Sequence, residues 1–346
     1  MSDGRSASLP DLSNREKSLK TVKELCTREG TEGWELAKKT MLNATIASSG
    51  LKEVIDETMR KGQPDYFRPA LLSLCCRAVG STSRATASLG AFFILTAKAI
   101  GIHDDIIDHS RSKEGRKTIL GKHGRDIALI LSDVLLFKSF NMLRKTLQLG
   151  VSTEDMAAIL DTIDKTWTSE QSSAEALDLE FRKRFDLSPR QCLTKISMVA
   201  SEIEAIARTG GILGGSSQPI LEVLGEYGRL LGTNAILTDE IVDMLQLKTL
   251  RKRLKKETVP LPLLYALETQ LSPEITNLLQ ASELNSGTLN AISRLATKGM
   301  KKVSKLIASN IETARNLTSQ LTYCSEELNL LIASTSISPK DWSYET

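Results

Sequence analysis

Apolar residues recur at three- and four-residue spacing along most of the chain, which is the pattern of a helix with one buried face. The segments KEVIDETMRK (52–61) and DMAAILDTIDKTW (155–167) show this spacing clearly. No stretch alternates apolar and polar residues for long enough to require a β-strand. The pattern predicts an all-α protein, built as one bundle of roughly ten or more helices.

Polar segments that contain glycine or proline predict where these helices end. The clearest loop is SKEGRK (112–117). Further breaks are predicted at residues 148–155, 184–191, 210–219 and 247–262. We find no internal repeat and no shift in composition, so residues 15–346 are expected to form one domain behind a disordered polar segment, 1–14.

One predicted helix is apolar on nearly all of its faces. It runs through STSRATASLGAFFILTAKAIGIHDDIID (81–108) and opens with Ser and Thr residues, which are good helix N-caps. A helix of this kind belongs in the middle of a bundle, because each of its faces needs a packing partner.

Composition places the chain among soluble globular proteins. Of its 346 residues, 41% are hydrophobic and 25% are charged. The net charge of +3 and the 4% aromatic content are too low for a nucleic-acid-binding surface, so we expect no nucleic-acid partner. The N-terminus lacks the apolar core of a secretory signal, and no uncharged apolar run is long enough to cross a membrane.

The cysteines point to a reducing compartment. There are five, Cys26, Cys75, Cys76, Cys192 and Cys324, and they are scattered without a CxxC pair. Buried free thiols are the simplest interpretation. Together with the absence of a signal, this predicts a cytoplasmic protein.

Three aspartates interrupt the apolar helix near its end: Asp104, Asp105 and Asp108. On a helix, Asp104 and Asp108 share a face, because they are four residues apart. Carboxylates that lie so close repel one another and are costly to remove from water. Taken alone, this cluster fits a solvated helix end as well as it fits a binding site.

A second acidic cluster lies in NAILTDEIVDML (234–245), where Asp239, Glu240 and Asp243 repeat the spacing of the first. Two such clusters on separate apolar helices can face each other across a cavity and hold hard divalent cations. Mg²⁺ fits best, because it keeps part of its water shell and takes further ligands from a substrate phosphate.

A di-iron carboxylate centre is the alternative kind of metal site. It requires Glu-x-x-His pairs on the helices. The three histidines, His103, His109 and His123, are not in that spacing, which disfavours iron.

With these motifs the chain resembles the polyprenyl synthetase (trans-isoprenyl diphosphate synthase) family. HDDIID (103–108) resembles the first aspartate-rich motif of the family and DEIVD (239–243) the second. FRPALLSLCCRAVG (67–80) resembles the segment that follows a GKxxRP signature. The resemblance continues through EALDLEFRKRFDLSP (175–189), TKISMVASEIEAIARTGGILGG (194–215) and VPLPLLYAL (259–267).

The resemblance implies a fold, a reaction and a set of metal ligands. The fold is the all-α isoprenoid synthase bundle, with a central cavity between the two aspartate-bearing helices, and the protein is a homodimer. The substrate is an allylic prenyl diphosphate, which the family ionises with the help of three Mg²⁺ ions. The implied metal ligands are Asp104, Asp105, Asp108, Asp239 and Asp243.

Two basic residues match the family positions that hold the allylic diphosphate, Lys113 and Lys195. Five residues before Asp104 the family places a residue that limits the product length. Ala99 stands there, which implies that a C20 or longer chain fits, although a small residue for helix packing is an equally good interpretation.

The site for the second family substrate, isopentenyl diphosphate, departs from the pattern. Arg68 is kept, but Asp65, Ala97 and Glu114 stand where the family has a lysine, a histidine and an arginine. Each charge-assisted contact to a diphosphate is worth about 1.5–3 kcal/mol. Losing three of them lowers the affinity by about a thousandfold or more.

These substitutions lead us to expect an enzyme that ionises a prenyl diphosphate without using isopentenyl diphosphate. The cation would then cyclise, eliminate or react with water, as in class I terpene synthases. Ordinary prenyl transfer is the alternative reaction. A non-catalytic subunit of a heteromeric prenyl synthase is a third possibility, but such subunits commonly lose the aspartates that this chain retains.

The segment KTLRKRLKKE (248–257) is strongly basic. A solvated loop is its simplest interpretation. A flap over the diphosphate, or peripheral contact with anionic lipid, is the functional one, so we expect at most peripheral membrane contact.

Overall fold

The computed structural model describes residues 15–113, 115–280, 283–337 and 342. The segment predicted to be disordered, residues 1–14, lies outside them. Over the described part the chain is almost entirely helical, and the strands found there pair as one short antiparallel hairpin. The prediction of an all-α bundle is confirmed.

The first half of the chain supplies the helices on one side of the bundle and the hairpin. In order these elements are α1 (Arg15–Leu42), α2 (Ser49–Asp56), the π-helical turn η2 (Glu57–Lys61), α3 (Phe67–Ala78), α4 (Ala85–Ile107), β1 (Ser112–Lys113), β2 (Arg116–Lys117), α5 (Ile119–His123), α6 (Arg125–Gln148), α7 (Thr153–Thr162) and η3 (Ile163–Thr168), again π-helical.

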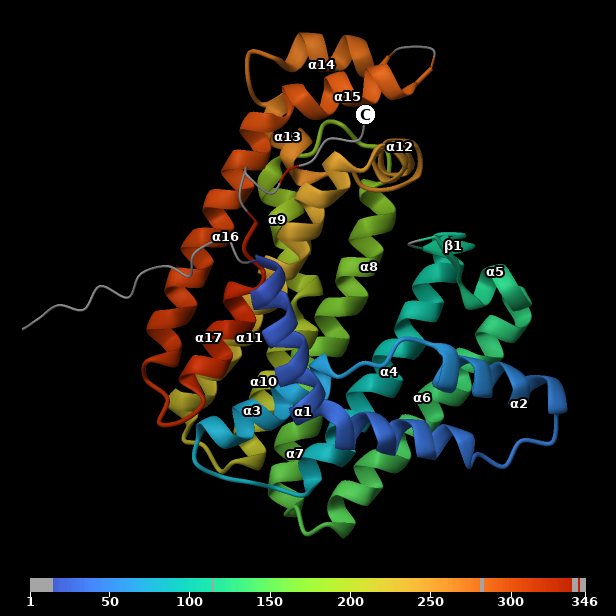
Figure 1. The fold of residues 1–346 in the computed structure, drawn as a ribbon, viewed down its shortest axis with the longest axis vertical. Helices are drawn as coiled ribbons and strands as arrows, with labels where there is room; N and C mark the ends of the chain where they lie inside the picture. Colours follow the sequence, from blue (N-terminus) through green and yellow to red (C-terminus); the bar gives the residue numbers. More distant parts are fainter. Residues whose placement is uncertain (1–14, 114, 281–282, 338–341, 343–346) are drawn as a thin grey trace, which may run out of the picture.

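The second half continues the bundle. Its elements are α8 (Ser169–Phe181), α9 (Pro189–Val199), α10 (Ser201–Leu213), α11 (Gln218–Leu245), α12 (Leu247–Lys256), α13 (Leu261–Leu267), α14 (Ser272–Leu279), α15 (Ser286–Leu295), α16 (Thr297–Thr318) and α17 (Ser325–Ala333). Helices α8, α9, α11 and α16 run along the long axis, and α14 and α15 lie across one end (Figure 1).

Helix α4 packs against α1, α3, α6 and α10, as its apolar sequence requires. It is long and apolar enough to span a membrane, but 67% of its most apolar window is buried inside the bundle. Residues from Leu89 to Leu95 are buried without interruption. This helix therefore serves as the core of the fold, and its C-terminal end carries the first acidic cluster.

The break predicted within residues 210–219 is confirmed, because α10 ends at Leu213 and α11 begins at Gln218. The first two glycines of this segment, Gly210 and Gly211, still belong to α10. A Cβ atom at Gly210 would lie 2.6 Å from the carbonyl oxygen of Leu72. Glycine is needed here because α10 and α3 approach too closely for a side chain, so the sequence GG marks close packing.

The basic segment predicted to be a loop forms helix α12. Its apolar residues Leu247, Leu250 and Leu254 are buried, and they share one helix face. Of the basic residues between and after them, Lys252 and Arg253 form ion pairs with Glu257 and Asp243, and Lys255 and Lys256 are exposed. The helix forms because its apolar stripe covers the end of α11.

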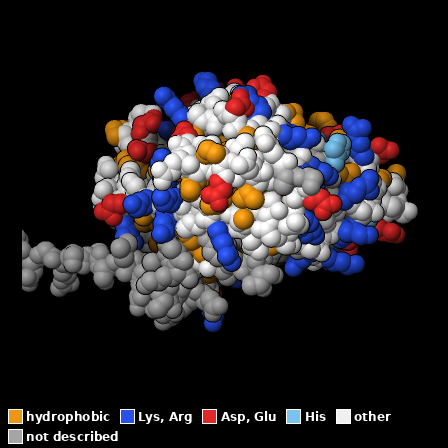
Figure 2. Space-filling model, turned by 90° about the horizontal axis from the view of Figure 1, so that it is seen from above, with side chains coloured by type: hydrophobic (Ala, Val, Ile, Leu, Met, Phe, Trp, Pro, Cys, Tyr) orange, Lys and Arg blue, Asp and Glu red, His pale blue; other side chains and the backbone are white. Residues whose placement is uncertain are grey.

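The molecular surface carries both charge signs. On the face seen from above, Lys and Arg side chains are interspersed with Asp and Glu (Figure 2). This mixture agrees with the small net charge of +3.

Candidate functional site

A polar pocket of about 230 Å³ lies where α4, α8, α9, α11 and α12 converge, near the end of α4. Helix α4 contributes Asp104 and Asp108, and α9 contributes Lys195. The other charged residues that line it are Glu175, Asp178, Glu240, Arg253 and Glu257. The fold therefore brings the first acidic cluster together with one member of the second, Glu240, and with a predicted diphosphate ligand.

The hairpin places Lys113 over the first acidic cluster. Its Nζ donates a hydrogen bond to Asp104 Oδ2 at 2.8 Å and lies 2.9 Å from Asp105 Oδ1. Burial raises the pKa of Asp105, an effect that Lys113 opposes. Burial and the neighbouring Asp104 raise the pKa of Asp108 to about 6. The cluster thus holds more negative charge than its surroundings stabilise, as expected of a site for cations.

Helix α8 and its C-cap residue, Arg182, supply charged side chains to the site that the sequence did not predict. Arg182 forms an ion pair with Asp108, and its Nε lies 3.8 Å from Asp178 Oδ2. Asp178 also forms an ion pair with Lys195 and accepts a hydrogen bond from Thr258 Oγ1 at 2.9 Å. Burial alone would raise the pKa of Asp178, but Lys195, Thr258 and Arg253 together outweigh it and the pKa is lowered.

The sequence did contain a signal for this group. Glu175, Asp178 and Arg182 follow one another at spacings of three and four residues, so they share one face of a helix. A charged stripe of this kind beside an apolar core indicates a functional cavity as readily as a solvated surface.

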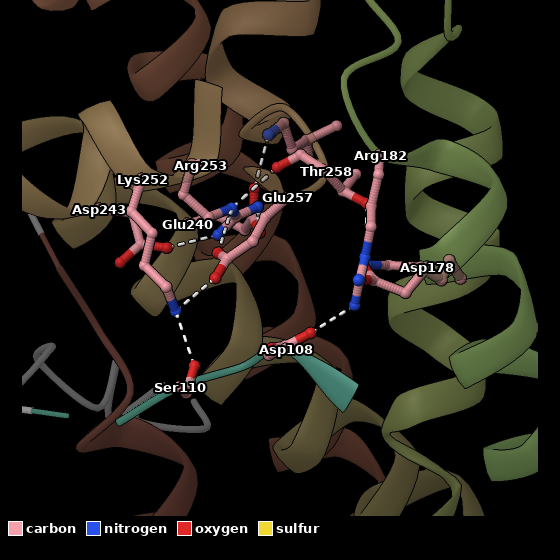
Figure 3. A network of polar contacts seen from close by, with 12 residues as sticks. Asp108, Ser110, Asp178, Arg182, Glu240, Asp243, Lys252, Arg253, Glu257 and Thr258 are labelled. Carbon is pink, nitrogen blue, oxygen red and sulfur yellow. Dashed lines mark hydrogen bonds and ion pairs between the residues drawn. The ribbon is translucent and has the colours of Figure 1, made fainter. Parts of the chain in front are cut away.

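The second acidic cluster is held by an arginine of α12. Arg253 Nη2 donates to Glu240 Oε1 at 2.7 Å, and Nη1 forms an ion pair with Asp243. Figure 3 shows Arg253 beside these two carboxylates, and Arg182 beside Asp108 and Asp178. Asp239, the predicted metal ligand of this cluster, is exposed and is not among the residues that line the pocket.

An apolar cavity of about 560 Å³ lies beside the polar pocket. Glu175 lines both, so the two are neighbours. The remaining lining comes from α4 (Phe92, Thr96, Ile100, His103), α6 (Leu136, Phe140), η3 (Ile163, Trp167, Thr168) and α8 (Gln171, Ser172). The cavity thus has an acidic mouth and an apolar interior.

Aromatic rings close the far end of this cavity. The rings of Phe92 and Trp167 meet edge to face with centroids 6.4 Å apart, and Phe93 lies 5.5 Å from Trp167. Ala99, the residue predicted to limit the product length, is buried in the core, while its neighbour Ile100 lines the cavity.

His103 lies next to the first acidic cluster in the sequence but does not bond to it. Its Nε2 lies 2.8 Å from Ser132 Oγ, which connects α4 to α6.

Arg68 lies apart from the polar pocket and is already paired. It donates two hydrogen bonds to Glu202, at 2.7 and 2.9 Å, and one to Asp65 at 2.6 Å. Lys98 is close enough to interact electrostatically with Asp65 and Arg68, and burial lowers its pKa. Lys98 is thus a cation in the region where Ala97 replaces the family histidine. Glu114 lies outside the described residues.

The first acidic cluster fits a divalent cation. Its donors are carboxylate oxygens, which Mg²⁺ prefers. Asp105 Oδ1 is buried and accepts no hydrogen bond of good geometry, although Lys113 lies nearby. No group of three or more metal-binding side chains is preassembled within the described residues. A bound ion would therefore take further ligands from water and from a substrate.

Comparison with known proteins agrees with this arrangement. A family model described as polyprenyl synthetase matches residues 49–295. The chain is 32% identical over 181 residues to a geranylgeranyl diphosphate synthase of Methanosarcina mazei, covering 51% of this chain and 54% of that protein. The chain spans about half the length of the first curated relatives it matches, 54% in each case.

Two solved structures show the same fold. A geranylgeranyl pyrophosphate synthetase from Pyrococcus horikoshii superposes with a TM-score of 0.77 and 20% identity, covering 90% of this chain and 97% of that chain. A polyprenyl synthase from Caulobacter crescentus, complexed with calcium and isoprenyl diphosphate, gives a TM-score of 0.70 and 17% identity. The superposition covers 94% of this chain and 95% of the Caulobacter crescentus chain. The all-α bundle predicted from the sequence is therefore the fold of these two proteins.

Proposed function

This chain belongs to the polyprenyl synthetase family, and from that premise we propose that it condenses an allylic prenyl diphosphate with isopentenyl diphosphate. Similar proteins are named as synthases of prenyl diphosphates. Those names support prenyl transfer better than the cyclisation that the sequence led us to expect. The observation that carries the proposal is the junction of the two cavities at Glu175.

The two cavities suit the two ends of an allylic prenyl diphosphate. The polar pocket offers Lys195 and Arg253 to the diphosphate, and Lys113 lies over the adjoining aspartates. The apolar cavity takes the prenyl chain, and its aromatic far end limits how long that chain can be. Charge that develops on the leaving diphosphate would be stabilised by these fixed cations.

Mg²⁺ would be held by Asp104, Asp105 and Asp108, whose oxygen donors fit it. When bound, it supplies Lewis-acid stabilisation of the departing diphosphate. Asp239 stays a predicted ligand from the second cluster, and three ions remain a prediction from the resemblance.

In the proposed reaction, the allylic carbon–oxygen bond breaks and its electron pair leaves with the diphosphate. The double bond of isopentenyl diphosphate then supplies the electrons of the new carbon–carbon bond. A proton is lost to the released diphosphate, which restores a double bond. The product is an allylic diphosphate that is five carbons longer.

The depth of the apolar cavity sets the expected chain length. Phe92 and Asp104 both lie on α4, 12 positions apart in the sequence. At about 1.5 Å per residue, they are about 18 Å apart along the helix axis. An extended chain gains about 1.2 Å per backbone bond, so an isoprene unit of four bonds spans about 5 Å. Three to four units therefore fit, which corresponds to a C15 to C20 chain.

Ionisation without isopentenyl diphosphate is the second candidate, and a specific observation favours it. Arg68 is the one family ligand for that substrate that the chain retains, and it is bound on both sides by Glu202 and Asp65. An arginine with its charge already compensated attracts a diphosphate weakly. Lys98 nearby could offset part of this loss.

We further expect a cytoplasmic homodimer with at most peripheral membrane contact. The exposed side chains of Ile130, Phe137 and Phe140 on α6 support a second copy packing there. Sedimentation velocity of the purified protein measures whether it is a dimer.

The deciding experiment incubates purified protein with Mg²⁺ and C10–C25 allylic diphosphates, with and without isopentenyl diphosphate. Elongated diphosphates that form only with isopentenyl diphosphate support prenyl transfer. Hydrocarbons or alcohols formed without it support the second candidate and refute the first. No turnover of any substrate refutes both and favours a non-catalytic subunit.

A further inference from the structure

Of the two cations that line the polar pocket within the described residues, Arg253 has more partners than Lys195, which pairs with Asp178. Its Nη2 bonds to Glu240, its Nη1 forms an ion pair with Asp243, and its Nε donates to the carbonyl oxygen of Thr258 at 2.8 Å. Glu257 lies 3.8 Å from the same Nε. All three guanidinium nitrogens are therefore engaged, and the side chain is only 12% exposed.

The partners of Arg253 are fixed as well. Glu240 uses its second oxygen, Oε2, to accept a hydrogen bond of 2.6 Å from the backbone N–H of Leu261, the first residue of α13. The Glu240 side chain is only 7% exposed. A metal ion on Glu240 would have to displace either Arg253 of α12 or the N–H of Leu261 in α13. Both contacts tie these helices to α11.

Lys113, the cation at the first acidic cluster, is held less firmly than Arg253. It stands on an exposed hairpin, its side chain is 48% exposed, and it reaches Asp104 and Asp105 through a single nitrogen. A flexible lysine can move toward solvent or substrate when a metal ion takes its place. A buried arginine held by two carboxylates and a carbonyl cannot leave without stranding those charges.

We infer that Arg253 is the permanent cation of the second acidic cluster, and that Glu240 and Asp243 bind this arginine instead of a divalent ion. The inference rests on the proposed function only in assuming that the pocket receives a diphosphate. It disagrees with the metal role that the sequence motif implied for Asp243. Glu240 and Asp243 do not fit a metal, because Arg253 holds both and is itself fixed at all three nitrogens. Arg182, which pairs with Asp108, is held less firmly, since its buried Nε has no hydrogen-bond partner.

The arrangement keeps a guanidinium in the lining of the pocket at any Mg²⁺ concentration. Arg253 lines the pocket opposite Asp104 and Asp108. A diphosphate between them would meet a fixed guanidinium on one side and metal-binding carboxylates on the other. The site would then need divalent ions mainly at the first cluster.

The test counts bound Mn²⁺ by electron paramagnetic resonance in the presence of inorganic pyrophosphate, which requires no turnover. The Asp243→Asn variant should bind the same number of ions as the wild type, with affinities within about twofold. The Asp104→Asn variant should lose at least one ion or weaken binding more than tenfold. Asp133→Asn is a matched control, because Asp133 is 61% exposed.

Loss of an ion in Asp243→Asn, to the extent seen in Asp104→Asn, would overturn the inference. Unchanged Mn²⁺ binding in Asp104→Asn would instead refute the metal site of the proposed function, so the two failures are distinguishable. A second variant, Arg253→Gln, frees Glu240 and Asp243 and should gain one bound Mn²⁺ without pyrophosphate. No gain in a protein that is folded by circular dichroism would also overturn it.

Discussion

Replacing Trp167 with alanine should lengthen the prenyl chain that the protein makes. The indole closes the far end of the apolar cavity, with its ring 6.4 Å from that of Phe92. Removing it extends the cavity by about the separation of the two rings, and an isoprene unit spans about 5 Å. The main product should therefore gain about one isoprene unit, from C15–C20 to C20–C25.

The assay compares products from C10 diphosphate and labelled isopentenyl diphosphate by chromatography. Trp167 is 3% exposed, so the alanine variant should also lose about 3–5 kcal/mol of stability, and thermal unfolding must be checked first. Trp167→Leu is the milder second variant. Tyr323→Ala is the control, because Tyr323 is an aromatic residue that is 56% exposed and does not line the cavity. An unchanged product length in a folded Trp167 variant refutes the reasoning.

Three further predictions concern the acidic cluster, the second-substrate site and stability. Asp104→Asn should slow diphosphate release about 10²–10³-fold, because the departing charge loses its cation site. Asp65→Asn should lower the KM for isopentenyl diphosphate about 10–100-fold, because Arg68 regains about 1.5–3 kcal/mol of attraction for the diphosphate. Glu29→Gln should lower the free energy of unfolding at pH 7 by about 1.5–3 kcal/mol, because Glu29 accepts a hydrogen bond from Arg77 at 2.8 Å. The pKa of Glu29 is lowered in the folded state, since the burial that would raise it is outweighed by the arginines. The wild-type advantage should therefore be complete above the usual pKa of 4.5 and shrink as the pH falls below it.

Each of these predictions has a contradicting result. An Asp104→Asn variant that keeps a tenth of the wild-type rate would place the cation site elsewhere. An unchanged KM in Asp65→Asn would show that Arg68 does not contact isopentenyl diphosphate. Chemical denaturation at pH 7 and pH 3 decides the third, and a difference between wild type and Glu29→Gln that grows toward pH 3 contradicts it.

The sequence predicted the helices and the first acidic cluster because these depend on local spacing. The apolar run before Asp104 could only be a central helix, and α4 is one. The basic segment 247–256 was misassigned as a break, because its many charges hid the stripe formed by Leu247, Leu250 and Leu254. Looking for apolar residues at helical spacing beneath the charges would have found α12.

The ion pairs of the site could not be predicted in the same way. Arg182 meets Asp108 from a position 74 residues away in the chain, and Arg68 meets Glu202 across 134 residues. Such contacts depend on how helices pack, which periodicity does not fix. The resemblance therefore implied a metal role for Asp243, while its partner Arg253 became visible only in the fold.

The central claim is prenyl transfer, and label incorporation tests it most directly. Purified protein, Mg²⁺, C15 allylic diphosphate and radiolabelled isopentenyl diphosphate are incubated, and label is measured in longer allylic diphosphates. The account predicts label in a C20 diphosphate. Consumption of the C15 substrate with no label in any longer diphosphate would contradict it.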